Sequence, residues 1–87
     1  MADVEAEDRE NLKAENAAFA RRMGSQFKML REGKNWSQEA LSEKSGVARN
    51  YVGQVERGER SVTIFTARRI LRALGVTLSK FLSDMTE

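Results

Sequence analysis

The sequence predicts an all-α fold built as one small domain. Its 87 residues contain no proline, so glycines and residues with hydroxyl side chains are expected to mark the ends of the helices. Apolar residues recur three and four positions apart along most of the chain, which is the period of an amphipathic helix. No segment shows the strict alternation of a half-buried strand. A chain of this length forms a single core that is only marginally stable by itself, and association would therefore help it.

The first helix is predicted to show its clear apolar pattern from Ala17, to end at Gly33 and to have an N-terminal extension upstream of Ala17. Met1 to about Asp8 is expected to be a frayed end, although the helix formers from Asn11 to Ala18 could extend the helix upstream. We therefore divide the chain into an acidic extension, residues 1–16, and a folded domain, residues 17–87. One apolar stripe of this helix is expected to face the core: Phe19, Met23, Phe27 and Leu30.

Four shorter helices follow, joined by connections of a few residues. Their predicted ranges are Ser37 to Ser45, Ala48 to Arg57, Thr63 to Leu74, and Thr77 to about Leu82. Ser37 and Thr63 are good N-cap residues, and Gly46, Gly58 and Gly75 follow the expected helix ends. The residues expected to face the core of the third and fourth helices are Val52, Val55, Ile64, Ala67, Ile70, Leu71 and Leu74.

Charge divides the chain into an acidic leader and a basic body. Residues 1–16 hold six acidic and two basic side chains, whereas residues 17–87 hold thirteen basic and seven acidic ones. A basic body is suited to a polyanion such as nucleic acid. The third predicted helix also presents a row of polar side chains that are suited to the edges of base pairs and to phosphates: Arg49, Asn50, Gln54 and Arg57.

The composition excludes several classes of protein. Without cysteine or histidine the chain has no disulfide framework, no zinc-finger ligand set and no Ser-His or Cys-His catalytic pair. No acidic pair lies in an apolar setting, so we predict no enzyme, no cofactor, no metal and no small-molecule ligand. No apolar run approaches the roughly 18 residues of a membrane span, and no signal peptide is visible. We expect a cytoplasmic protein without a membrane partner.

Three segments together resemble a known family: LREGKNWSQEALSEKSGV, YVGQVERGER and LRALGVTLSKFL. From about Phe19 to Leu82 the chain is similar to the Cro/C1-type helix-turn-helix domain of phage repressors and xenobiotic-response-element regulators. The stretch RNYVGQVERGERSVT looks particularly like the controller proteins of restriction–modification systems. The resemblance implies a five-helix, lambda-repressor-like domain that acts as a homodimeric transcriptional regulator on double-stranded DNA with a pseudo-palindromic operator.

The resemblance also implies roles for individual residues. Base contacts would come from Arg49, Asn50 and Gln54, with Gln38 touching a phosphate or bracing a base-reading residue. Arginine can bond guanine, and asparagine adenine, in bidentate fashion. Phosphate contacts would come from Tyr51, Arg57, Arg60, Ser61, Thr63, Lys34 and Asn35. Arg31 and Glu56 match positions of a buried ion pair, and Trp36 and Val47 match core positions.

Some residues depart from the family pattern. Ala48 stands where a Ser or Thr N-cap is usual, and Phe65 stands where a polar residue is usual. An aromatic at that position suggests an association surface, and the predicted dimer contacts are Phe65, Leu78, Phe81 and Leu82, with Ile64 nearby. Arg68, Arg69 and Arg72 are either a solvated face or partners for the acidic leader of a second subunit.

Two other functions fit the same residues. The protein could be the antitoxin of a toxin–antitoxin pair that holds its toxin through the acidic leader or Phe65. It could also be a helix-turn-helix module that binds protein and not DNA.

Overall fold

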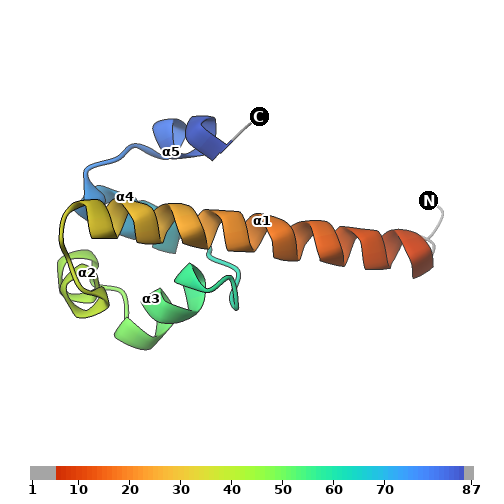
Figure 1. Cartoon of the computed structure of the whole chain (residues 1–87), viewed down its shortest axis with the longest axis horizontal. Helices are drawn as coiled ribbons and strands as arrows, with labels where there is room; N and C mark the ends of the chain where they lie inside the picture. The colour runs from red at the N-terminus through yellow and green to blue at the C-terminus, as the bar shows by residue number, and fades with distance from the viewer. Residues whose placement is uncertain (1–5, 86–87) are drawn as a thin grey trace.

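The computed structural model describes residues 6–85, and these residues form five helices and no strand (Figure 1). The predicted all-α, five-helix fold is confirmed. In chain order the helices are α1 (Ala6–Gly33), α2 (Gln38–Ser45), α3 (Arg49–Glu56), α4 (Ile64–Leu74) and α5 (Leu78–Met85). Among these helices, none is long and apolar enough to cross a membrane.

Helix α1 has the N-terminal extension upstream of Ala17 that the sequence predicted. It has 28 residues and crosses the predicted boundary between residues 16 and 17 without a break. At about 1.5 Å per residue its length is about 42 Å, and Figure 1 shows its N-terminal half projecting beyond the other helices. The upstream residues are good helix formers with neither proline nor glycine among them, which explains the extension. The predicted frayed end is therefore wrong for residues 6–8, and residues 1–5 lie outside the described residues.

The helix ends follow the predicted caps. The side-chain oxygens of Ser37 and Thr63 accept hydrogen bonds from the backbone amides of Ala40 and Thr66, at 3.0 and 3.1 Å. Gly46 and Gly75 close α2 and α4 in the left-handed conformation. Ala48 precedes α3 without any side-chain cap. A Ser or Thr there would be worth about 1 kcal/mol, so packing must hold the start of α3.

All five helices contribute side chains to the core, including Leu41 of α2, which is fully buried. Phe27 of α1 and Phe81 of α5 are buried, and their rings stack with centroids 4.5 Å apart. Phe81 is fully buried, so the prediction that it forms part of a dimer surface is wrong. Its position on the inner face of α5 sends the ring onto Phe27 instead.

Two other predictions about the core are also wrong. Phe19 is 40% exposed because it lies at the edge of the fold, beside the loop after α3, and Ile64 is 54% exposed because it lies in the first turn of α4. Met23 and Leu30, from the same predicted stripe as Phe19, are only partly buried but do pack against the core. Trp36 is likewise partly buried against the core, and Val47 is buried within it.

Helices α1 and α3 touch backbone to backbone at Gly24. A Cβ atom added to this residue would lie 2.6 Å from the carbonyl oxygen of Glu56. Real Cβ atoms do not come this close to backbone, so only glycine allows the approach. Gly24 therefore sets the position of α3 relative to the long helix.

Candidate nucleic-acid interface

Helix α3 separates its residues by face. Val52, Val55 and Glu56 are buried, whereas Arg49 and Asn50 are exposed and Gln54 is half-buried. The apolar residues pack on the core at helical spacing, which forces the polar ones to the opposite side. The predicted reading face of Arg49, Asn50 and Gln54 is thus accessible to a ligand.

Arg49 is held by a carboxylate of the preceding helix. Its Nη1 atom lies 3.3 Å from Oε1 of Glu39 in α2, and both side chains are almost two-thirds exposed. Such an exposed ion pair contributes about 0.2–1 kcal/mol to stability, so it opens readily. A base or phosphate that binds Arg49 must displace Glu39 from it.

Gln54 belongs to a small network with Arg60 and Tyr51. Nη1 of Arg60 donates to Oε1 of Gln54 at 3.1 Å, and the Arg60 guanidinium lies 5.1 Å from the centroid of the Tyr51 ring. The Tyr51 hydroxyl donates to the carbonyl of Ser61 at 3.1 Å. These contacts fasten the loop after α3 to the recognition face. A phosphate contact by the Tyr51 hydroxyl would need its bond to Ser61 to break.

Arg57 is paired with Glu59 across the end of α3. Its Nε and Nη2 atoms donate to the two oxygens of Glu59, at 2.8 and 3.1 Å. The hydrogen bond and the opposite charge lower the pKa of Glu59 and raise the pKa of Arg57. The carboxylate thus stays charged to lower pH than an ordinary glutamate, and it competes with phosphate for Arg57.

A buried network fixes the orientation of α3 from behind. Nε and Nη2 of Arg31 donate to Oε2 and Oε1 of Glu56 at 2.7 and 3.0 Å, which confirms the predicted ion pair. The bonded Glu56 carboxylate raises the pKa of Arg31. Arg31 also donates to the backbone oxygen of Trp36, and the side-chain amide of Gln38 donates to Oε1 of Glu56 at 3.0 Å. The network therefore ties α1, α2 and α3 together.

The role of Gln38 follows from this network. Its amide braces Glu56, a structural residue, and not one of the three predicted base-reading residues. Its carbonyl oxygen lies beside Gly53, on α3. A base or phosphate contact by Gln38 stays a prediction.

The other predicted phosphate contacts lie at the edges of the reading face. Lys34 and Lys44 both place their ammonium groups over the Trp36 ring, at 5.3 and 4.9 Å from its centroid. Asn35 has a positive φ of 60°, so it makes the left-handed turn between α1 and α2. The Thr63 hydroxyl is occupied by the cap of α4 and by the Thr66 hydroxyl. Ser61 is exposed.

Helices α2 and α3 are short and are joined at an angle by the tight turn at Gly46. The second of them, α3, carries the exposed polar face. The sequence profile of the family described as Helix-turn-helix (HTH_3) matches residues 27–81, which run from α1 into α5. The chain belongs to the helix-turn-helix family. The predicted resemblance is therefore confirmed.

Known helix-turn-helix proteins resemble the chain to different extents. It is 39% identical over 65 residues to the HTH-type transcriptional regulator SutR of Escherichia coli (strain K12), a match that covers 75% of the chain but only 36% of SutR. The restriction–modification controller protein C.AhdI of Aeromonas hydrophila has 36% identity and a TM-score of 0.71, over 74% of the chain and 97% of C.AhdI. The controller protein C.Esp1396I, solved as a tetramer with its natural 35 base-pair operator, has 29% identity and a TM-score of 0.71, over 76% of the chain and 87% of that protein.

The sequence reasoning missed two carboxylates of the helix-turn-helix site. Glu39 and Glu59 each hold an arginine that was predicted to contact DNA. Glu59 is two residues from Arg57, a spacing that could have indicated the pair. Glu39 and Arg49 are on different helices, and only the angle between α2 and α3 brings them together.

Proposed function

We propose that this helix-turn-helix protein is a sequence-specific DNA-binding transcriptional regulator. The observation that carries the proposal is the exposed face of α3, where Arg49, Asn50 and Gln54 lie outward while Glu56 anchors the helix from behind. A rigid helix with outward arginine and amide side chains is suited to the major groove. Phosphate contacts from Arg57, Arg60 and their neighbours supply affinity that depends on salt.

We further propose that the protein acts as a homodimer on a pseudo-palindromic operator. Exposed apolar side chains on α4 and α5 support association: Phe65 is 73% exposed, Ile64 54% and Leu82 38%, and Leu78 is half-buried. Two copies would place their α3 helices about 34 Å apart, which is one turn of DNA. Sedimentation of the free protein as a monomer at tens of micromolar would contradict the dimer.

The likeness to C.AhdI and C.Esp1396I supports a finer role as the controller of a restriction–modification system. In that role the protein would bind DNA upstream of its own gene. In the proposed role the protein binds DNA in the cytoplasm and catalyses no reaction. Binding to a fragment from upstream of its own gene, compared with an unrelated fragment, tests the controller role.

Selection of bound fragments from a random DNA pool tests the proposed function directly. We expect a symmetric motif for the unchanged protein. The Arg49→Ala variant should lose preference for this motif while it keeps weak, salt-sensitive binding, because each good bidentate base contact is worth about 1–3 kcal/mol. Lys28→Ala is a matched control, since Lys28 is an exposed basic residue of α1 outside the reading face. Equal affinity of the unchanged protein for the motif and a scrambled sequence would refute the proposal.

A further inference from the structure

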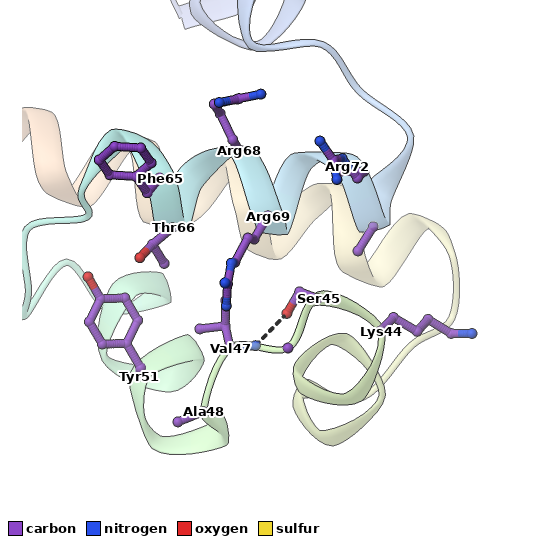
Figure 2. A pocket seen from close by; sticks show the side chains of 12 residues that line it. Lys44, Ser45, Val47, Ala48, Tyr51, Phe65, Thr66, Arg68, Arg69 and Arg72 are labelled. Atoms are coloured by element: carbon purple, nitrogen blue, oxygen red, sulfur yellow. Dashed lines mark hydrogen bonds between the residues drawn. The ribbon is translucent and has the colours of Figure 1, made fainter.

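Helix α4 carries a basic face that no other part of the described chain neutralises. Arg68, Arg69 and Arg72 are exposed and follow Phe65 at helical spacing. Within residues 6–85 none of the three arginine side chains has a hydrogen bond or an ion pair. Figure 2 shows Arg69 pointing toward the turn between α2 and α3, and Arg68 and Arg72 at the other edge of α4. Like charges one turn apart repel each other and destabilise a helix, so an anionic partner would relieve this repulsion.

This basic face forms one wall of an open depression of about 890 Å³, with the turn between α2 and α3 as the opposite wall (Figure 2). Among the residues that line it there are four cationic side chains and no carboxylate: Lys44, Arg68, Arg69 and Arg72. Phe65 adds an aromatic ring at the edge. The depression is therefore suited to a partner that presents both carboxylates and apolar groups.

The N-terminal half of α1 has this chemistry. Residues 6–16 of this helix carry four acidic and two basic side chains. Leu12, Glu15 and Phe19 follow one another at i, i+3 and i+7, so they share one face of the helix. Leu12 is 48% and Phe19 40% exposed. Glu15 has no ion pair with any described residue. A projecting helical segment of this length is marginally stable without a partner.

The segment cannot reach the depression of its own chain. Helix α1 is continuous from Ala6 to Gly33 and projects away from the other helices (Figure 1). The depression is lined by α4 and by the turn between α2 and α3, and α1 passes behind α4 in Figure 2. Only another molecule can bring an acidic helix to it.

We propose that the basic face of α4 binds the N-terminal half of α1 from a second copy of this chain, an inference that rests on the homodimer proposed above. The face with Leu12 and Phe19 packs against Phe65, and Glu15 pairs with the arginines of α4. In a two-fold dimer the contact occurs twice, because the α1 helix of each copy binds the basic face of the other copy. The acidic extension is then a dimerisation arm.

Charge reversal tests the arm in the full-length protein. Sedimentation equilibrium without DNA should show that Glu15→Lys and Arg69→Glu each weaken the dimer about tenfold at low salt, since each removes two symmetric pairs and introduces repulsion. The double variant should recover to within about threefold of the unchanged protein. Glu10→Lys is the matched control, because it makes the same charge change on another face of the segment. Its dimer should stay within about twofold of the unchanged one.

Other outcomes would overturn the inference. An unchanged dimer dissociation constant in both single variants would refute the proposed role of the arm, while the proposal of a homodimer would still stand. A monomeric starting protein would refute the homodimer and the arm together. If Arg69→Glu lowered DNA affinity at saturating dimer concentration, with no change in dimerisation, the basic face would be a phosphate contact instead. Both changed side chains are exposed, so circular dichroism should show unchanged folding in every variant.

Discussion

Removal of the Glu56 carboxylate should strongly destabilise the fold. Glu56→Ala leaves the guanidinium of Arg31 largely buried, with Nε and Nη2 deprived of their bonds at 2.7 and 3.0 Å. The Arg31 side chain is only 10% exposed, so water cannot replace both bonds. The amide of Gln38 loses its acceptor at the same time.

The size of the effect follows from these contacts. Breaking one side of a buried ion pair costs about 3–5 kcal/mol. For a domain of this size each 1 kcal/mol lowers the melting temperature by about 4–8 °C, so we expect a fall of at least about 12 °C. Raising the pH within the usual range cannot rescue the variant, because an arginine side chain stays protonated there even without the Glu56 bond that raises the pKa of Arg31. The orphaned charge persists wherever the protein is folded.

Thermal unfolding followed by circular dichroism, at several protein concentrations to separate folding from association, measures the change. Glu59→Ala is the matched control, since it removes an exposed carboxylate that also binds an arginine, and we expect little change in melting temperature. Replacing both partners, with Arg31→Met and Glu56→Leu, should recover much of the loss because no buried charge is left. A melting temperature of Glu56→Ala within about 2 °C of the unchanged protein would refute the reasoning on the buried pair.

Three further predictions concern the helix contacts and the reading face. Gly24→Ala should lower the free energy of unfolding by about 1–3 kcal/mol, because the new Cβ atom meets the Glu56 carbonyl, and urea titration measures this. An unchanged free energy of unfolding would mean that α1 and α3 can move apart without cost, and it would contradict the role given to Gly24. Glu39→Gln should tighten DNA binding about two- to fivefold, because it releases Arg49, as judged by fluorescence anisotropy. Glu43→Gln, on the same helix without an ion pair in the described chain, should have less effect, and equal effects would refute competition at Arg49. Tyr51→Phe should loosen the loop after α3 and speed amide exchange there, and unchanged exchange would rule out the bond to Ser61 as its anchor.

Local signals in the sequence were enough for most of the fold. Ser37, Thr63, Gly46 and Gly75 mark helix ends through bonds within a few residues, and the structure has them in these roles. Helix propensity predicted that the first helix extends upstream of Ala17, but it did not locate the first residue of α1. Propensity without packing does not say whether a helix persists.

The sequence by itself determined the five helices, the buried side of α3 and the polar residues opposite it, because these depend on spacing along one helix. Only the tertiary structure decided which residues from different helices meet. It brought Glu39 to Arg49, placed Gln38 on Glu56 and buried Phe81 against Phe27. Such contacts depend on the angles at which helices pack, and in α1 and α3 that packing depends on the backbone approach at Gly24.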